Sequence, residues 1–254
     1  MLNHIGLVLL LFSLSFPSAL SLLLSRRSLL LSPFLLPPSL PSTPYDGYAK
    51  TYDSLDGGPL ASLLSLDVGR AALLSRVRPG STVLELGAGT GLNLPYYPEG
   101  LSSLALVDSS REMLKVASSK PPPPSALRPT RYLVADVTSS DSMSSALPDG
   151  EEFDYVVDTF SLCVLGQEGA VSALRNARAR LKRGGEVLLF ENSRSSQSLI
   201  AAYQDLTAEY AAENGGRGCL YNQDVRGLAE EAGLRVVEEV GYKGGIFRAL
   251  VCVI

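Results

Sequence analysis

The chain has 254 residues, of which 46% are hydrophobic, and a formal net charge of −4. This length suffices for one α/β domain with a sizeable core plus a leader. The mild acidity and the lack of a long Lys/Arg cluster argue against nucleic acid as the main partner. The three cysteines, Cys163, Cys219 and Cys252, are far apart in the sequence, which argues against a disulfide framework and a metal-binding motif.

Residues 1–44 differ from the rest of the chain, because they contain no Asp or Glu and are rich in Leu and Ser. Residues 5–24 form an uncharged stretch of 20 residues, just long enough to span a membrane, although four serines and Pro17 weaken that interpretation. The same segment fits a secretory signal cleaved near Ala19 or an organelle transit peptide. A retained membrane anchor and a cleaved targeting leader stay open. Both indicate an organelle (mitochondrion or plastid) or the endomembranes.

The folded domain is predicted to span residues 45–254, and its first part, 45–79, is an N-terminal cap of helices over 45–53 and 60–74. Apolar residues recur at helical spacing in the second of these. The only histidine, His4, precedes the domain, which therefore lacks the commonest general base.

The most informative motif is LELGAGTG (84–91), in which a predicted strand, 82–86, enters a loop and then a helix over 92–97. Gly87, Gly89 and Gly91 suit such a loop because glycine accepts a positive φ and lets a ligand approach the backbone. A dinucleotide fingerprint needs a third glycine where Leu92 stands. The loop therefore indicates a nucleoside-type cofactor, with S-adenosylmethionine the obvious candidate.

Strands and helices alternate along the rest of the chain. The predicted strands are 104–107, 132–135, 155–157, 187–190, 235–240 and 246–254, and the predicted helices are 110–118, 139–146, 170–181, 199–213 and 222–232. This alternation predicts an α/β fold: a Rossmann-like, doubly wound, seven-stranded sheet that is mostly parallel. The last two strands are joined by a Gly-rich turn and are expected to form an antiparallel hairpin at the sheet edge. The prolines at 121–124 indicate a surface loop.

A polar residue ends each of five strands in turn: Glu85, Asp108, Asp136, Asp158 and Glu191. Ligands of doubly wound sheets bind at these carboxyl ends. Asp108 can accept both ribose hydroxyls, and a hydrogen bond to a charged group contributes about 1.5–3 kcal/mol. Asp136 can accept the adenine amino group while Val137 packs on the ring, although Asp136 alone fits a helix cap equally well. Asp158 and Thr159 would lie near the amino-acid part of the cofactor.

The chain resembles class I S-adenosylmethionine-dependent methyltransferases from Tyr45 to its end. The resemblance rests on LELGAGTG (84–91), LVD (106–108), ADV (135–137), FDYVV (153–157) and RLKRGG (180–185). The segment YDGYAKTYD (45–53) is similar to the first helix of the methyltransferase type 11, quinone-biosynthesis (UbiE) members. That similarity implies that the helix folds over the cofactor, with Tyr45 or Tyr52 near its methionine end. An amphipathic helix packed on the sheet is the alternative.

Two further segments, NLPYYP (93–98) and FSLCVL (160–165), are similar to membrane-anchored methyltransferase-like proteins. These are the mitochondrial inner-membrane type and the methyltransferase-like 7 thiol methyltransferases, and they carry an N-terminal hydrophobic anchor. The resemblance therefore implies membrane association through residues 5–24. In that subgroup the fifth strand often ends in Glu-His, whereas this chain has Glu191-Asn192.

The strand ends and the resemblance together imply S-adenosylmethionine as cofactor and no metal. The expected cofactor-binding residues are Tyr45, Tyr52, Glu85, Gly87, Ala88, Gly89, Thr90, Gly91, Asn93, Asp108, Ser109, Met113, Asp136, Val137, Asp158 and Thr159. The expected acceptor-side, catalytic residues are Asp158, Glu191 and Tyr203.

The predicted function is methyl transfer to a small-molecule acceptor, such as a thiol, a phenol or a quinone-like compound. In-line attack on an activated methyl group depends on positioning more than on acid–base chemistry, and positioning alone can contribute about 7–11 kcal/mol. Cys163 is not expected to act as a nucleophile, because it lies in an apolar run. Two alternatives are a non-catalytic, methyltransferase-like assembly factor at an organelle membrane and an NAD(P)-dependent oxidoreductase.

Overall fold

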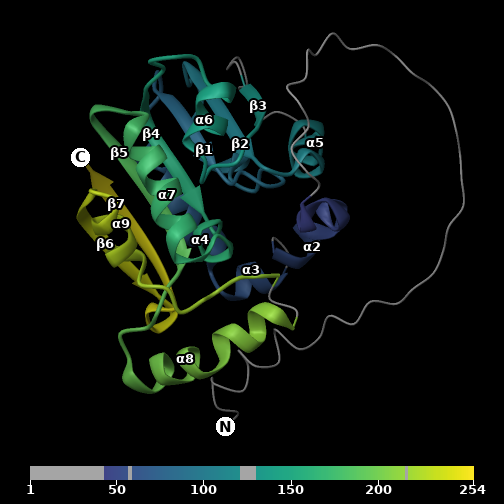
Figure 1. Ribbon diagram of the computed structural model, residues 1–254, viewed down its shortest axis with the longest axis vertical. Coiled ribbons are helices and arrows are strands. Elements are labelled where there is room, and N and C mark those ends of the chain that lie inside the picture. Colours follow the sequence, from purple (N-terminus) through teal and green to yellow (C-terminus); the bar gives the residue numbers. More distant parts are fainter. Residues whose placement is uncertain (1–42, 57–58, 121–129, 215–216) are drawn as a thin grey trace, which may run out of the picture.

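The computed structural model describes residues 43–56, 59–120, 130–214 and 217–254 (Figure 1). Its centre is a seven-stranded sheet with the order β3-β2-β1-β4-β5-β7-β6. The strands are β1 (Thr82–Leu86), β2 (Ser103–Asp108), β3 (Thr130–Val134), β4 (Phe153–Thr159), β5 (Leu181–Asn192), β6 (Arg235–Tyr242) and β7 (Phe247–Val253). All seven predicted strands are present, and the predicted α/β fold class is confirmed.

The sheet is parallel except around β7, which runs antiparallel to both of its neighbours. The predicted C-terminal hairpin of β6 and β7 is therefore confirmed. Within this hairpin, β7 lies between β5 and β6, so β6 is the strand that forms the edge of the sheet. β7 residues are buried accordingly, whereas β6 alternates between half-buried and exposed residues.

Helices cover both faces of the sheet (Figure 1). α6 (Ser140–Ala146), α7 (Gly166–Ala179) and α9 (Val225–Glu231) contribute to the core on one face, and α4 (Leu66–Leu74) and α5 (Arg111–Ser119) to the core on the other. The register explains this division, since Leu84 and Leu86 of β1 face the first core while Val83 faces the second. α8 (Ser198–Glu213) lies along one end of the sheet rather than on a face.

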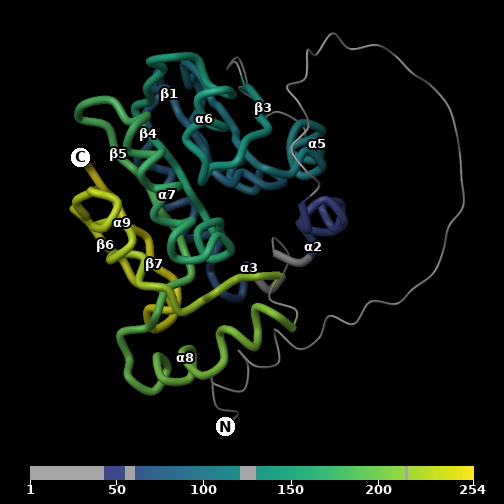
Figure 2. Tube along the Cα trace, viewed as in Figure 1, coloured from purple at the N-terminus to yellow at the C-terminus, as the bar shows by residue number. Residues whose placement is uncertain are grey.

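The N-terminal cap is more broken than predicted (Figure 2). The expected helix 45–53 is two short 3₁₀ turns, η1 (Pro44–Gly47) and η2 (Ala49–Thr51), followed by α2 (Tyr52–Asp56). Tyr48 separates the two turns with a non-helical φ of −121°. The expected helix 60–74 is α3 (Pro59–Leu63) and α4, interrupted where Ser65 adopts a left-handed φ of 61°. The apolar spacing of 60–74 continues across this break, so the spacing alone predicted one helix where the chain forms two.

The predicted helix at 92–97 is also wrong. The chain forms only the 3₁₀ turn η3 (Leu94–Tyr96) there, since Pro95 and Pro98 remove two backbone donors that a helix would need. The predicted helix 170–181 is α7, which begins earlier and ends at Ala179, and Leu181 already belongs to β5.

Residues 1–42 of the leader predicted at 1–44 and the proline loop predicted at 121–124 lie outside the described residues. Within the described ranges, no helix is both long enough and apolar enough to cross a membrane.

Candidate functional site

The glycine loop, residues 87–91, connects β1 to η3 with positive φ at Gly87 (56°), Gly89 (53°) and Gly91 (75°). A Cβ on Gly87 would lie 2.2 Å from the Cβ of Ser161, so no other residue fits there without movement. A Cβ on Gly89 would meet only the carbonyl oxygen of Gly87, at 3.9 Å. The loop is thus tightly packed at Gly87 and open at Gly89, where a ligand can approach the backbone.

Asp108 ends β2 beside this loop. One carboxylate oxygen accepts the backbone N–H of Gly89 (2.8 Å), and the other accepts that of Ser110 (2.7 Å). Burial raises the pKa of Asp108 despite these two hydrogen bonds. Each oxygen keeps a further lone pair, so the carboxylate can still accept hydroxyl donors.

The first residues of the N-terminal cap reach over the loop through acids rather than tyrosines. Asp46 accepts a hydrogen bond from the hydroxyl of Ser110 (2.6 Å), and Asp53 accepts one from Thr90 (2.5 Å). Lys120 forms an ion pair with Asp53 (2.7 Å). The sequence analysis missed Asp46 and Asp53, although both acids belong to the motif at 45–53.

The tyrosines of the cap lie toward the segment that follows α8, and Tyr45 is near Cys163. The Tyr45 hydroxyl donates to the carbonyl of Arg217 (3.1 Å), and the Arg217 guanidinium lies over the Tyr48 ring. Tyr52 stacks on Tyr48 with 6.2 Å between ring centroids. These contacts connect the cap to the segment that follows α8.

Glu85 is buried inside the end of β1. The Tyr97 hydroxyl donates to one of its oxygens (2.6 Å), and the Asn93 amide donates to the other (3.1 Å). The same amide nitrogen also donates to Thr159 (2.9 Å). Burial raises the pKa of Glu85 to about 7. Glu85 and Asn93 are therefore held within the protein's own network, and Tyr97 is a member that sequence reasoning did not identify.

Asp158 and Glu191, called the acid pair below, meet at the ends of β4 and β5. The backbone N–H of Ser161 is shared by Glu191 (2.9 Å) and Asp158 (3.3 Å), and the Ser161 hydroxyl donates to Asp158 (2.6 Å). Asp158 is 1% exposed and Glu191 is 0% exposed. The Oε2 atom of Glu191 finds no donor among the described residues.

Burial and the neighbouring Asp158 raise the pKa of Glu191 well above its ordinary range, and burial also raises the pKa of Asp158. Two carboxyl groups that compete for one donor in a buried place are most stable when they share a single proton. A proton held on either carboxyl would allow that group to donate a hydrogen bond to the other.

At the β3 end, Asp136 does not cap α6, because the N-cap of that helix is Ser139. One Asp136 oxygen accepts the backbone N–H (2.9 Å) and hydroxyl (2.7 Å) of Thr138, and Val137 is buried with its carbonyl bound to Asn176 (2.8 Å). Asp136 is only half-buried, so a ligand can also reach it.

The three remaining candidates lie in α8, in α5 and just before α5. Ser109 is half-buried just before α5, and Met113 is buried within it. Tyr203 is half-buried in α8, where its carbonyl accepts a hydrogen bond from Thr207, and the structure does not join it to the acid pair by a hydrogen bond.

Cys163 and Cys219, which are far apart in the sequence, are neighbours in the structure. The Asn192 amide nitrogen lies 3.4 Å from the Cys219 sulfur and 3.7 Å from the Cys163 sulfur. Contact with Cys219, together with burial, raises the pKa of Cys163 well above its ordinary value. Nothing in the spacing of 163 and 219 could have revealed this proximity. Within the described part of the chain, no group of three or more His, Cys, Asp or Glu could hold a metal ion.

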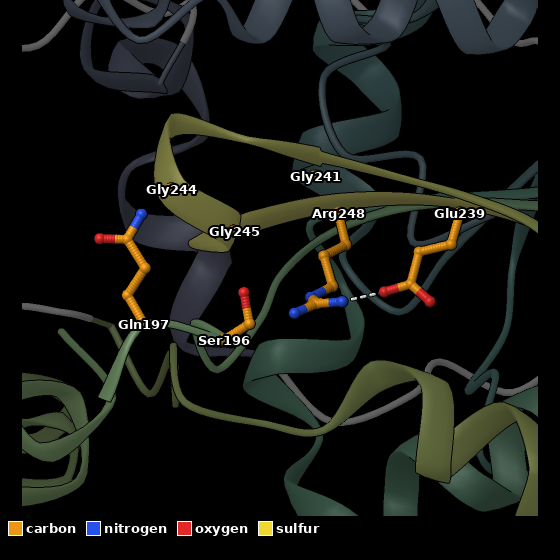
Figure 3. A pocket seen from close by; sticks show the side chains of 7 residues that line it. All are labelled: Ser196, Gln197, Glu239, Gly241, Gly244, Gly245 and Arg248. Atoms are coloured by element: carbon orange, nitrogen blue, oxygen red, sulfur yellow. Dashed lines mark hydrogen bonds and ion pairs between the residues drawn. The ribbon is translucent and has the colours of Figure 1, made fainter. Parts of the chain in front are cut away.

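A separate, open pocket lies where the turn between β6 and β7 faces the start of α8 (Figure 3). It contains Ser196, Gln197, Glu239, Gly241, Gly244, Gly245 and Arg248. Arg248 is paired there with Glu239, which also binds Arg226 (2.6 Å). None of the predicted site residues lines this pocket.

Known proteins with similar sequences carry a methyltransferase domain. Residues 64–239 match the family described as a methyltransferase domain. The phosphatidylethanolamine N-methyltransferase of Cereibacter sphaeroides is 30% identical over 175 residues, which cover 67% of this chain and 79% of that protein. The ubiquinone/menaquinone biosynthesis C-methyltransferase UbiE of Shewanella sp. (strain ANA-3) is 31% identical over 137 residues, covering 52% of this chain and 51% of that protein.

The fold has solved counterparts. The CcbJ methyltransferase from Streptomyces caelestis matches with a TM-score of 0.58 and 22% identity, over 83% of this chain and 97% of that one. The chain spans about half the length of the UbiE relative that it matches. The three proteins named here are described as methyltransferases.

Proposed function

Because this chain belongs to the S-adenosylmethionine-dependent methyltransferase family, we propose that it transfers a methyl group to a small-molecule acceptor at the carboxyl ends of β1, β2, β4 and β5. The buried acid pair carries this proposal, since its carboxyls lie beside the glycine loop through Ser161 and would accept a proton from an acceptor bound there. The contact between Gly87 and Ser161 supports the placement, because it makes the loop and the acid pair neighbours.

The residues present fit S-adenosylmethionine. The open backbone at Gly89 and the carboxylate of Asp108 would hold the ribose, and Asp136 with Val137 would border the adenine. Asp158 and Thr159 would border the amino-acid part, while Asp46 and Asp53 would keep residues 43–56 over the site. When bound, the cofactor supplies a methyl group on a positively charged sulfur, which is already activated for transfer.

The chain's own residues would position the acceptor and receive its proton. An acceptor with an ionisable S–H or O–H releases one proton as it is methylated, and the acid pair can take up one more proton than it holds. The pair is 0–1% exposed, so an acceptor that binds against it would react in a place with little access to water. Positioning and exclusion of water are therefore the expected sources of rate, with the proton transfer as a smaller contribution.

We propose a thiol, a phenol or a quinone-like compound as acceptor, with membrane association through residues 5–24 and an organelle or endomembrane location. Two observations support a lipid-associated acceptor. Residues 5–24 are uncharged and apolar, and the relatives are described as acting on phosphatidylethanolamine and in ubiquinone/menaquinone biosynthesis.

The test is a product assay by mass spectrometry with the full-length protein, S-adenosylmethionine and a panel of thiols, phenols and quinone precursors. A methylated product from one class identifies the acceptor. Glu191→Gln should lower its formation while leaving cofactor affinity within a few fold in calorimetry. If the protein binds S-adenosylmethionine but methylates no member of the panel, the proposed acceptor classes are wrong and the assembly-factor alternative gains support.

A further inference from the structure

Cys163 and Cys219 come from distant parts of the chain and lie together beside the acid pair. Cys163 belongs to η4 (Leu162–Val164), directly after β4, whereas Cys219 follows α8. The backbone N–H of Leu220 donates to the carbonyl of Cys163 (2.8 Å), which fixes the two segments against each other. Both sulfurs lie within 3.7 Å of the same Asn192 nitrogen.

The two thiols differ in their access to solvent. Cys163 is 2% exposed, while Cys219 is half-buried and open to small reagents. The third cysteine, Cys252, is 0% exposed in β7, and its pKa is raised to about 12 by burial. The chain therefore holds one accessible thiol, one buried thiol next to it, and one buried thiol elsewhere that serves as an internal control.

We propose that Cys163 and Cys219 are a redox-active thiol pair that a small disulfide, such as oxidised glutathione, converts to an intramolecular disulfide. The two thiols share Asn192 as a neighbour, and the backbone hydrogen bond from Leu220 holds their segments against each other, so the chain already keeps the pair together. Neither the position of the pair nor its chemistry depends on which acceptor is methylated.

The reaction proceeds in two exchanges. The Cys219 thiolate attacks one sulfur of the small disulfide, whose S–S bond breaks and releases one thiol, leaving a mixed disulfide on Cys219. The Cys163 thiolate then attacks the Cys219 sulfur and releases the second thiol, which takes the proton that Cys163 lost. Two electrons pass from the thiol pair to the small disulfide. The second exchange requires the Cys163 thiolate and is therefore faster at higher pH.

The disulfide would fix the segment after α8 to η4. This segment carries Arg217, whose carbonyl binds Tyr45 of the N-terminal cap, and Gln223, whose carbonyl binds Ser193. Oxidation would therefore hold the cap, the segment at 217–223 and the end of β5 together around the acid pair. An acceptor that enters past Cys219 would be excluded from the oxidised protein.

The experiment treats the reduced full-length protein with oxidised glutathione, blocks the remaining thiols and maps tryptic peptides by mass spectrometry. The expected product links peptide 132–175 to peptide 218–226, while peptide 249–254, which carries Cys252, is recovered as a blocked thiol. In Cys163→Ser, the glutathione adduct on Cys219 should persist. In Cys219→Ser, Cys163 should stay unmodified over the time in which the wild type is converted.

Cys252→Ser is the matched control, and it should form the link between 163 and 219 as the wild type does. The proposal is overturned if the wild type keeps glutathione on Cys219 with Cys163 free, or if Cys252 takes part in the main disulfide. Because the decisive measurement uses the wild type, a variant that fails to fold does not affect the result.

Discussion

The carboxylates in the two halves of the site receive their hydrogen bonds in different ways. At the ends of β1 and β2, each oxygen of Asp108 has its own backbone N–H donor. At the ends of β4 and β5, Asp158 and Glu191 compete for the N–H of Ser161, and one Glu191 oxygen has no donor among the described residues. In the first half, both oxygens of Asp108 are held by backbone donors, so the carboxylate is fixed in an orientation suited to hold a ligand. The second half has a carboxylate oxygen that finds no donor in the described part of the chain and can bind a further proton, as a group that gains and loses protons requires.

The largest effect is expected at Gly87, where the two halves touch. Gly87→Ala adds a Cβ 2.2 Å from that of Ser161 at a φ of 56°, so overpacking and the left-handed backbone together should lower the free energy of unfolding by about 2–5 kcal/mol. Gly89→Ala is the matched control, because its φ of 53° is similar and its Cβ has space. Denaturant unfolding should show the smaller loss for Gly89→Ala. Equal losses would mean that the halves are not packed together through Ser161.

Glu85 should contribute a pH-dependent stability. Its folded pKa of about 7 lies above the ordinary 4.5, so the stability from protonation is complete below pH 4.5 and is lost as pH rises through 7. The difference corresponds to about 3 kcal/mol. Glu85→Gln should remove this fall when unfolding is measured between pH 4.5 and 8. The exposed Glu168→Gln should keep the wild-type profile, and a Glu85→Gln profile parallel to wild type would contradict the burial argument.

Asp108→Ala should weaken S-adenosylmethionine binding at least tenfold, or about 1.4 kcal/mol, because the ribose loses its charged acceptor. Titration calorimetry with the full-length protein measures this change. Asp205→Ala is the control, since Asp205 is an exposed acid of α8 that pairs with Arg194. Unchanged affinity in Asp108→Ala would place the ribose elsewhere, and no heat with the wild type would contradict the cofactor site as a whole.

The smallest effect is expected in the cap. Asp53→Ala removes the acceptor of the Thr90 hydroxyl and should loosen residues 43–56 by about 1 kcal/mol. Amide hydrogen exchange should be faster over this segment and unchanged in β4 and β5. Asp149→Ala, an exposed acid in a turn, should change neither. Faster exchange across the whole protein would mean that the cap is part of the core rather than a cover.

The sequence was informative where structure is local. The glycine loop, the strand that precedes it and the acids at strand ends all depend on neighbouring residues, and they lie as predicted. The cap was harder, because Tyr48 and Ser65 interrupt helices whose apolar spacing is regular. The thiol pair and the shared donor of the acid pair could not be predicted. They depend on where η4 meets the segment after α8 and on how closely β4 and β5 bring two carboxyls together, which no spacing within one segment encodes.

Ser161 connects the glycine loop to the acid pair, so a movement of the loop is expected to change how many protons the pair binds. Its Cβ lies where a side chain on Gly87 would be, while its N–H and hydroxyl hold the acid pair. A ligand that shifts the glycine loop therefore has to shift the donor that the two carboxyls share, and their single proton must redistribute or leave. The heat of cofactor binding should then vary with the ionisation enthalpy of the buffer. Calorimetry would thus detect a change in protonation on cofactor binding, before any methyl transfer.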